Sequence, residues 1–435
     1  MHCARHVGDS RRHPCERSLC LAMLFIISAI AISCAVVFLH RHLYRPTVVS
    51  IDRDYMNWGI LLPSLTLCEY EKLNETALQE YLKSQSGDTQ KLEHFLRHLV
   101  NLTIYNIDTL PNYPEIKPND YLKVMDALTN VHNNRIMFTA MNISIPLVRV
   151  VTEMGICWAF NSQLYPFSST EYHIYGRIPT QPELLEAIYP HGDNFLLLLG
   201  INGSSYDIYW HNPYDTLSLD SVIQMDREYP VYTSLVFQSF QLYCTEKVRR
   251  LFIYQRQCRF DDESNLDHFP YIYSYTICRT ECKIKRMLEV CGCIPIFYRA
   301  AESESYCGVK GLKCIVKHRM KIDKLSRDCQ CISRCEGVVY NLDTTKEIFW
   351  IGKSTLKWEL KTSKSRYRRD VIYGIEEVLT AIGANAGLFL GLSSLSAIEF
   401  LFFYFIHIFR FDRSRLNECL PEIPRRLLHV CHNSE

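Results

Sequence analysis

Residues 373–409 read YGIEEVLTAIGANAGLFLGLSSLSAIEFLFFYFIHIF, and this stretch decides how the rest of the chain is organised. Between Val378 and Phe409 the one carboxylate is Glu399. A hydrocarbon core is crossed by about 20 apolar residues, so the segment 378–409 is predicted to be a membrane helix. The segment is longer than a span requires, which predicts that the helix is tilted or broken.

Two features distinguish this segment from a plain membrane anchor. Gly383, Gly387 and Gly391 recur every fourth residue and form a small-residue stripe, which lets helices pack closely in lipid. A carboxylate such as Glu399 costs roughly a few kcal/mol against lipid, so it is expected to face water or a partner helix. On a continuous helix Ser396 and Glu399 share a face opposite the glycines, and a bend near Gly391 would bring both sets to one axis. The alternative is an anchor whose glycines only pack.

A second apolar segment runs from Leu19 to Leu39, after Arg17 and before the pair His40-Arg41. The apolar region of a secretory signal has only about 7–15 residues, whereas this segment is longer and ends without a small-x-small cleavage site. We therefore predict a retained transmembrane helix over 19–39, with residues 1–18 as a short cytosolic N-terminus. A cleaved signal peptide is the alternative.

Composition places the part between the two apolar segments outside the cell. The chain has 435 residues and a formal net charge of +1, so nothing indicates a nucleic-acid partner. Most of its 19 cysteines lie between Cys68 and Cys335, which is typical of an oxidising compartment. N-glycosylation sequons lie in the same part of the chain, at Asn74, Asn101, Asn142 and Asn202.

These features predict a plasma-membrane protein with two spans in the lipid bilayer. The extracellular domain covers residues 40–372, and both termini are cytosolic, the second over 410–435. The C-terminal tail is basic, as the positive-inside tendency predicts; its arginines are Arg410, Arg413, Arg415, Arg425 and Arg426.

Local patterns within the outer domain predict both helices and strands. Residues 194–210 predict a β-hairpin that turns at Asn202-Gly203. Residues 228–255 predict further strands, and residues 275–293 predict a helix. Residues 73–100 predict helix with an apolar set formed by Leu78, Leu82, Leu92, Leu96 and Leu99.

Ten cysteines crowd residues 258–335. Pairs such as Cys-Gly-Cys raise the alternative of zinc, but zinc sites usually have two to four residues between ligands, and the expected compartment favours disulfides. Spacing alone does not determine the connectivity; a ladder from a helix to a returning strand would pair early with late cysteines. No hydrolase, metalloprotease or phosphate-loop motif is present, so no enzymatic activity, cofactor or metal is expected.

Four stretches resemble the degenerin/epithelial sodium channel superfamily, and most closely its insect pickpocket branch. The segments 63–68, PSLTLC, and 155–161, GICWAFN, resemble two motifs of the family's outer domain. The cysteine-rich block 258–335 resembles its thumb region, and the span from Gly383 to Glu399 resembles its second transmembrane helix. Together these cover the chain from about residue 40 to the second span.

The resemblance implies an α+β membrane protein that forms a homo- or hetero-trimer with related subunits. Each subunit would have two transmembrane helices around a large disulfide-rich extracellular domain, with a β-rich palm and ball and a helical finger, knuckle and thumb. It also implies six disulfides: Cys68–Cys157, Cys258–Cys335, Cys278–Cys331, Cys282–Cys329, Cys291–Cys314 and Cys293–Cys307. Cys244 is left over.

Functional roles follow from the same resemblance. Gly391-Leu392-Ser393 matches the belt that narrows the sodium pathway, and Ser396 and Glu399 match the polar ending of the pore helix. Thr380 matches a small-residue position at which bulky substitution holds related channels open. The implied function is a subunit of a sodium-selective, amiloride-sensitive channel that is gated by an extracellular ligand, proton or mechanical load. No regularly spaced arginines mark a voltage sensor.

Several positions depart from the family pattern. Ala384, Asn385 and Ala386 replace its Gly, Gln and Leu, and Leu392 is larger than the usual middle residue of the belt. The segment His6-Val7-Gly8 is not the family's cytosolic His-Gly dipeptide. Leu392 and the short N-terminus favour the alternative function, a non-conducting disulfide-rich receptor or a regulatory subunit that needs partners.

Overall fold

The computed structural model describes residues 13–53, 59–85, 88–130, 135–138, 143–180, 186–188, 195–201, 206–217, 223–227, 231–349, 354–361, 365–391, 393, 395–396, 398–399 and 401–405. It divides the chain into two units. Unit 1 comprises residues 1–46 and 371–435, and unit 2 comprises residues 47–370. Unit 2 lies within the range 40–372 that was predicted to be extracellular.

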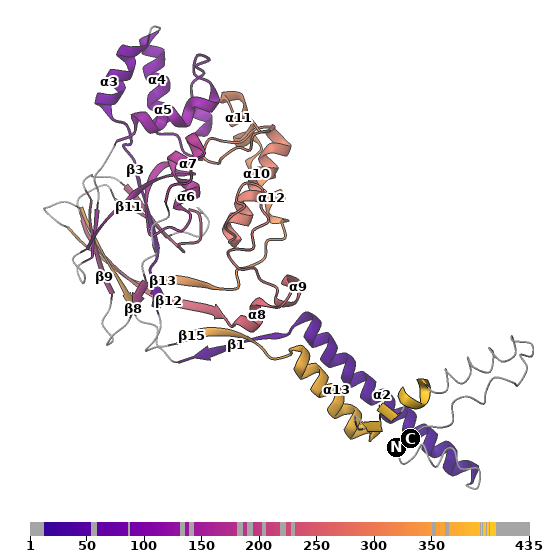
Figure 1. The fold of residues 1–435 in the computed structure, drawn as a ribbon. Helices are drawn as coiled ribbons and strands as arrows, with labels where there is room; N and C mark the ends of the chain where they lie inside the picture. Colours follow the sequence, from indigo (N-terminus) through magenta and orange to yellow (C-terminus); the bar gives the residue numbers. More distant parts are fainter. Residues whose placement is uncertain are drawn as a thin grey trace, which may run out of the picture. The chain divides into compact units, whose positions relative to one another are not determined.

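Unit 1 contains the long helix α2 (Pro14–Tyr44) and the helix α13 (Ile375–Leu390) (Figure 1). Proline in the first turn and the His13 side chain, which accepts the Cys15 N–H, start α2. The helix ends before Pro46, which disfavours helical geometry in the residue ahead of it. It therefore extends beyond the predicted span 19–39. Among the described residues, α2 is the helix long and apolar enough to cross a membrane.

Unit 2 is built on an eight-stranded sheet. Its strand order is β1-β15-β12-β14-β9-β4-β5, and β13 also pairs with β12. The long strand β12 runs antiparallel to β13 and parallel to β14 and β15. The strands are β1 (Thr47–Asp52), β4 (Arg135–Phe138), β5 (Ile143–Pro146), β9 (Phe195–Ile201), β12 (Val231–Cys244), β13 (Gly337–Phe349), β14 (Ser354–Lys361) and β15 (Arg366–Val371).

A second sheet has five strands in the order β11-β10-β3-β7-β6. Its central strands β3 and β7 are almost wholly buried; β7 is apolar throughout, and the buried Ser64 hydroxyl of β3 donates to the Phe160 carbonyl at 2.9 Å. A small two-stranded sheet pairs β2 (Gly59–Leu61) with β8 (Glu186–Ile188). The strands of the second sheet are β3 (Ser64–Glu69), β6 (Val148–Thr152), β7 (Gly155–Phe160), β10 (Tyr206–His211) and β11 (Ile223–Arg227).

The predicted hairpin over 194–210 is wrong. Both strands form, but β9 pairs with β14 and β4 in the large sheet, while β10 pairs with β3 and β11 in the second sheet. Each strand therefore has partners on both edges, so neither has an edge left for the other. The apolar run of β9 satisfies its backbone hydrogen bonds with strands that are distant in sequence, and this long-range pairing overrides the local turn signal.

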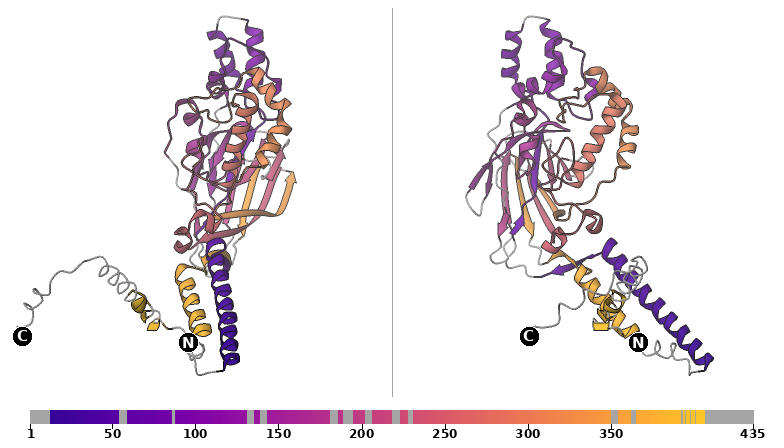
Figure 2. Two further views of the ribbon diagram at one scale, coloured as in Figure 1. Left: turned by 90° about the vertical axis from the view of Figure 1, so that its right-hand side faces the viewer. Right: turned by 45° about the vertical axis from the view of Figure 1, so that its right-hand side comes forward.

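Helices gather in two groups on unit 2, and the views in Figures 1 and 2 agree on this. One group contains α3 (Glu75–Ser84), α4 (Thr89–Val100) and α5 (Tyr121–Leu128). The other contains α10 (Tyr275–Cys291), α11 (Val309–Lys317) and α12 (Arg319–Arg327). The predicted helical region 73–100 is thus two helices, and all five leucines of its predicted apolar set are buried.

One hydrophobic core joins the two helical groups. Phe95 of α4 is fully buried and packs against the rings of Tyr113 and Tyr121, at centroid distances of 5.5 and 5.6 Å. Ile284 and Met287 of α10 belong to the same cluster. Each fully buried side chain of this size contributes about 1.5–3 kcal/mol, so the core holds α10 firmly against the α3–α5 group.

Short helices complete unit 2. The predicted strand region 228–255 is β12 as far as Cys244, but after it the chain forms α8 (Glu246–Arg249) and α9 (Ile253–Arg256). The remaining helices are α6 (Tyr165–Ser168), α7 (Thr170–Tyr175), and the 3-10 turns η2 (Ile107–Thr109) and η3 (Pro118–Asp120).

Candidate functional site

The helix α13 carries the first of the predicted site residues. Glu376 and Glu377 lie in its first turn, where negative charge favours the helix dipole. Thr380 donates its hydroxyl hydrogen bond to the carbonyl oxygen of Glu376, at 2.8 Å. The polar group of Thr380 is therefore satisfied by its own helix. A Cβ built at Gly383 meets no atom within 4 Å, so the glycine face is open in the single chain.

The apolar segment is interrupted at Gly391. This residue takes the left-handed conformation, with φ of +59°, and its N–H donates to the Gly387 carbonyl at 3.1 Å. Such a residue ends a helix, and glycine adopts the conformation without a Cβ penalty. α13 therefore ends at Gly391, and the bend that would bring the polar and glycine faces to one axis stays a prediction.

A new helical segment starts directly afterwards. The Ser393 hydroxyl oxygen accepts the N–H of Ser396 at 3.2 Å, and the two hydroxyls lie 3.1 Å apart. A serine that accepts the N–H three residues later is an N-cap. Residues 395–396, 398–399 and 401–405 are helical, and Glu399 is exposed in the single chain. Leu392, the middle residue of the predicted belt, lies outside the described residues.

Tyr373 ties the C-terminal end of α2 to the N-terminal end of α13. Arg41 donates to the Tyr373 hydroxyl at 2.7 Å, and its guanidinium lies 5.5 Å from the ring centroid. The His42 ring contacts the Tyr373 carbonyl at 2.7 Å. The backbone N–H groups of Ile372 and Tyr373 both donate to the Pro46 carbonyl. The beginning of α13 is therefore fixed to the end of α2.

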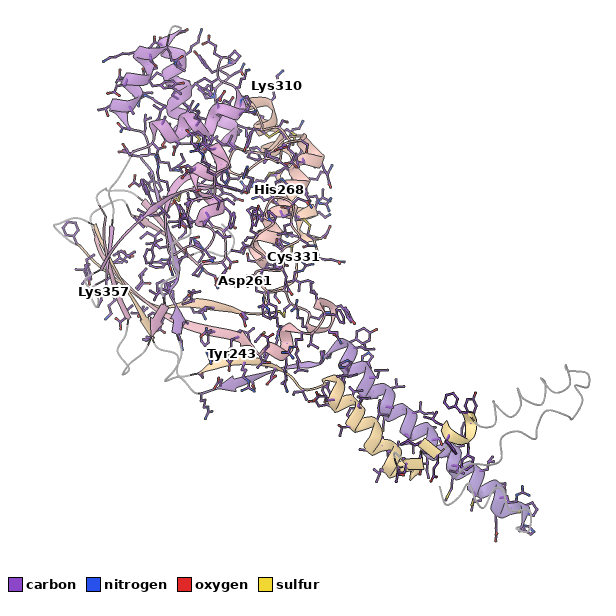
Figure 3. All side chains as sticks on the ribbon, in the orientation of Figure 1. Tyr243, Asp261, His268, Lys310, Cys331 and Lys357 are labelled. Carbon is purple, nitrogen blue, oxygen red and sulfur yellow. A yellow bond between two sulfur atoms is a disulfide. The ribbon has the colours of Figure 1, made fainter. Side chains whose placement is uncertain are left out.

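In unit 2, the strands that continue into these helices are clamped to β12. The Tyr243 hydroxyl donates to Asp52 of β1 at 2.6 Å, and Arg366 of β15 lies 3.5 Å from the same carboxylate. The Arg366 guanidinium lies 3.9 Å from the Tyr243 ring centroid. Thr245 donates to Asp370 of β15 at 2.8 Å. Figure 3 marks Tyr243 at this end of β12.

The described residues form six disulfides, and they are the six pairs that the resemblance implies. Two of them, Cys278–Cys331 and Cys282–Cys329, tie α10 to the segment that returns after α12. That segment is irregular, whereas the ladder was expected to join a helix to a strand. His318 lies beside the Cys291–Cys314 disulfide, but bonded sulfurs are not thiolate ligands for zinc.

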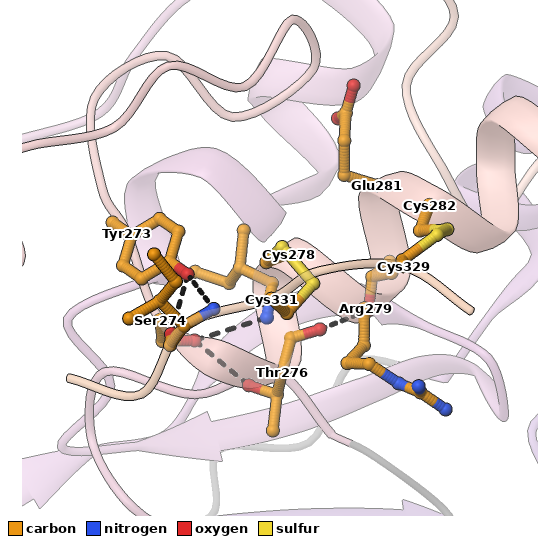
Figure 4. The surroundings of a disulfide bond; sticks show 12 residues. Tyr273, Ser274, Thr276, Cys278, Arg279, Glu281, Cys282, Cys329 and Cys331 are labelled. Atoms are coloured by element: carbon orange, nitrogen blue, oxygen red, sulfur yellow. Dashed lines mark hydrogen bonds between the residues drawn. A yellow bond between two sulfur atoms is a disulfide. The ribbon is translucent and has the colours of Figure 1, made fainter. Parts of the chain in front are cut away.

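Hydrogen bonds reinforce the disulfide ladder at the start of α10 (Figure 4). The Ser274 hydroxyl accepts the Ile277 N–H at 3.1 Å and caps the helix. The Tyr273 hydroxyl donates to the Ile332 carbonyl at 2.6 Å and accepts the Ile332 N–H at 3.1 Å. Arg279 donates to the Ser326 carbonyl at 3.2 Å. The helix and its returning segment therefore behave as one rigid piece.

Comparison with known families identifies the chain. The family model described as "Amiloride-sensitive sodium channel" matches residues 1–403. The chain belongs to the amiloride-sensitive sodium channel family.

Relatives of the chain include sodium channel and pickpocket proteins of Drosophila. The chain is 26% identical to the sodium channel protein Nach of Drosophila melanogaster over 182 residues, which cover 38% of this chain and 34% of the relative. It is 26% identical to Nach of Drosophila virilis, over 43% of this chain and 53% of the relative. It is also 26% identical to Pickpocket protein 11 of Drosophila melanogaster, over 37% of this chain and 34% of the relative. The aligned part therefore spans about a third to a half of these relatives.

The predicted glycosylation residues lie in different surroundings within this family member. Asn74 caps α3, because its side-chain oxygen accepts the N–H groups of Thr76 and Ala77. Asn101 donates its amide to the Arg97 carbonyl at 3.1 Å and is half-buried. Asn142 and Asn202 lie outside the described residues.

The predicted disulfides leave Cys244 over, and one further feature of this family member, at Asn385, was not found from the sequence. Cys244 is a free, partly buried thiol that contacts the Cys335 carbonyl, and burial raises its pKa to about 11, so it stays protonated and unreactive. Asn385 carries a buried amide nitrogen with no hydrogen-bond partner among the described residues. The available signal for Asn385 is a polar residue in an apolar helix.

Proposed function

We propose that the chain is a subunit of a sodium-selective, amiloride-sensitive, non-voltage-gated channel in the plasma membrane. The observation that carries the proposal is the interruption of the last apolar segment between Gly391 and Ser393. A helix end leaves up to four carbonyl groups without intrahelical partners. Non-helical backbone is tolerated at membrane depth only where it is buried in protein or lines a water-filled cavity. This requirement favours a pore lining over a lipid-facing anchor.

The chemistry of the interruption suits a small cation. Ion filters are built from rings of backbone carbonyls and of polar or charged side chains. Around one axis, three copies of the segment would supply the carbonyls freed near Gly391, the hydroxyls of Ser393 and Ser396, and the Glu399 carboxylates. In this arrangement 378–409 is the second membrane span, and both termini are cytosolic.

Assembly with further subunits would account for two features of the single chain, an unpaired amide nitrogen and an open space beside a glycine. The buried amide nitrogen of Asn385 has no partner in the described part of the chain, and leaving such a group unpaired costs about 1–3 kcal/mol. The space at Gly383 is open, and small residues favour close helix packing in lipid. A homo- or hetero-trimer would place neighbouring helices at these positions, with Gly387 on the same face as Gly383.

Gating is proposed to start in the disulfide-stiffened outer unit, under an extracellular ligand, proton or mechanical load. Both connections from unit 2 to unit 1 pass through neighbouring strands, β1 and β15; the Tyr243–Asp52 hydrogen bond fastens β1 to β12, and β15 pairs with β12 directly. Movement of these strands would turn α13 at Thr380 and widen the path at the belt formed by Gly391, Leu392 and Ser393.

Voltage clamp of cells that express the chain, alone and with related family subunits, tests the proposal. We expect an inward sodium current that amiloride blocks and that follows the sodium gradient on ion substitution. Surface labelling of the same cells shows whether the protein reaches the membrane. If surface-expressed protein carries no amiloride-sensitive sodium current in any combination, the channel function is refuted.

The second candidate is a non-conducting receptor or regulatory subunit, and the large Leu392 in the belt favours it. Chemical crosslinking in intact membranes separates the two functions, because a pore of this kind requires a trimer. A monomer would support the receptor. A hetero-trimer that conducts only through its partners, with no effect of mutations between Gly391 and Glu399 in this chain, would support the regulatory subunit.

A further inference from the structure

The helices α11 and α12 carry a dense group of exposed cations. Seven cationic side chains and one carboxylate, Asp323, lie between Val309 and Arg327, although the whole chain has a formal net charge of only +1. All seven cations are exposed. Arg319 lies 4.0 Å from Asp323, and the other six have neither an ion pair nor a side-chain hydrogen bond with the described residues. These six form the basic face: Lys310, Lys313, Lys317, Lys321, Lys324 and Arg327.

The spacing of the basic face follows the helical repeat. Its five lysines stand at positions i, i+3, i+7, i+11 and i+14, so those within one helix share a side. The inward sides of α11 and α12 are buried through Leu312, Ile315 and Ile322. Figure 3 marks Lys310 on α11. Packing of the apolar side chains against the core therefore turns the lysines toward solvent.

Disulfides hold the basic face in place. Cys291–Cys314 ties α11 to α10, and Cys282–Cys329 ties the residue two positions after α12 to α10 as well. Like charges three or four residues apart destabilise a helix, so helices of this composition depend on such tertiary links. A surface that is already ordered loses little conformational freedom when a partner binds.

The basic face is distant from the strands that lead to unit 1. Figures 1 and 2 show α11 beside the α3–α5 group, whereas β1 and β15 leave unit 2 at its other end. Unit 1 holds the proposed membrane spans, so the headgroups of the cell's own membrane are not the expected partner.

The form of the basic face favours a linear polyanion that is recognised by its charge. Lysine ammonium groups are point charges on flexible stems, and here they follow the helix surface instead of converging on one point. An acidic peptide would also use apolar or aromatic anchors. Within α11 and α12, which are described throughout, Met320 is the one exposed large hydrophobic side chain. Short basic stretches of this kind are typical of nucleic-acid or heparin binding, and nucleic acid is not expected outside the cell.

We propose that the basic face binds a sulfated polysaccharide, with its ammonium groups paired to successive sulfate groups. Pairing would relieve the repulsion between the lysines and release counterions from the polymer, as happens when cations bind a phosphate backbone. The proposal rests on the extracellular location of unit 2, which is part of the proposed function, and not on conduction. Binding in solution therefore fails or succeeds independently of any current.

The test uses the full chain in non-ionic detergent micelles and biolayer interferometry on immobilised heparin, a sulfated polysaccharide. We expect saturable binding that soluble heparin displaces. Four ion contacts predict a roughly tenfold loss of affinity between about 100 and 200 mM salt, by the rule established for nucleic acids.

Two other polyanions serve as competitors at equal charge concentration. Hyaluronan has carboxylates but no sulfates, and it should compete about tenfold more weakly than heparin because its widely spaced charges release fewer counterions. A random copolymer of glutamate and tyrosine represents an acidic peptide with aromatic anchors. It should also compete more weakly, because a flexible polypeptide loses more conformational freedom than a stiff polysaccharide.

A triple charge reversal locates the site. Lys313→Glu/Lys317→Glu/Lys321→Glu should weaken heparin binding at least about tenfold, since three ion contacts are lost. Replacing the same three lysines by glutamine is the second variant if the charge reversal does not fold, and it should weaken binding in the same direction by a smaller factor.

The matched control reverses three exposed lysines on α3, α5 and α8, in Lys83→Glu/Lys123→Glu/Lys247→Glu. It changes the net charge equally and should leave heparin binding within about twofold of the wild type, because long-range interactions between exposed charges are screened by salt. The proposal is overturned if heparin binding does not saturate, if hyaluronan competes as well as heparin, if the glutamate–tyrosine copolymer competes better than heparin, or if both triple variants weaken binding equally.

Discussion

Replacing Gly391 by alanine should suppress the interruption of the last apolar helix. A residue with a Cβ costs about 1–2 kcal/mol in the left-handed conformation. Alanine also favours a continued helix over glycine by about 1 kcal/mol. Because a Cβ at Gly391 meets no atom within 4 Å, steric contact adds nothing in the single chain. The two backbone effects act together, and about 2–3 kcal/mol corresponds to roughly a 30- to 150-fold smaller population of the interrupted form.

The assay is voltage clamp of cells that express Gly391→Ala, with the current divided by the amount of protein labelled at the surface. We expect the normalised sodium current to fall at least about tenfold, or the reversal potential to lose its dependence on sodium. Gly391→Asn is the matched variant, because asparagine is larger than alanine but tolerates the left-handed region better. If the backbone conformation at residue 391 determines the current, Gly391→Asn keeps more current than Gly391→Ala.

Two results would refute this reasoning. One is a Gly391→Ala channel with wild-type current and selectivity, which would mean that the interruption is not needed for conduction. The other is a larger loss with asparagine than with alanine, which would mean that side-chain size at the pore decides and not the backbone.

Three further predictions concern unit 2, and thermal unfolding of the full chain in detergent checks each of them. Gly155→Ala should lower the unfolding temperature strongly, because φ is +83° and a Cβ would lie 2.7 Å from the Leu102 carbonyl oxygen, whereas Gly337→Ala, with open space at its Cβ, should change it little. Replacing both Cys293 and Cys307 by serine should cost about 3 kcal/mol, the loop-entropy value for a closed loop of about 15 residues, and reduction of the wild type should abolish the difference. Burial opposes the charge of His268, but hydrogen bonds to two glutamates outweigh this effect and raise the pKa of His268 above the ordinary 6.5. The stabilisation from the charged ring is therefore full below pH 6.5 and is lost as the pH rises through the folded-state pKa. His268→Gln should therefore destabilise the protein most in acid, and a destabilisation that grows with pH would contradict this.

Local and motif-level features of the fold were predictable from the sequence. The helix over α10 follows from its periodicity and from a serine cap, and the buried leucines of α3 and α4 follow from their spacing. The six disulfide pairs follow from the family resemblance and not from spacing, since ten cysteines in one block allow many connectivities. The break at Gly391 has a local cause as well, because a glycine terminus and a serine cap stand two residues apart.

Long-range features were not predictable in the same way. Whether β9 pairs with its neighbour in sequence or with β14 depends on which partners bury its apolar faces, and β14 lies more than a hundred residues away. The contact of Arg41 with Tyr373 joins opposite ends of the chain, so no window of sequence contains it. The neutral state of His173 depends on burial and on the charge of Arg299, both of which exist only in the folded protein.

The position of the disulfides supports the proposed gating, in which a stimulus at the outer unit reaches the proposed membrane spans. The block 258–335 is an insertion between β12 and β13, which pair with each other along their length. The Cys258–Cys335 disulfide closes this insertion at its base, close to the end of β12 that carries Tyr243. In the proposed gating, a block closed in this way would pass its displacement to β12, which is fastened to β1 and β15 by Asp52 and Arg366. Those two strands are the links between unit 2 and unit 1 along the chain. A movement of unit 2 that leaves both strands in place therefore has no covalent route to α13.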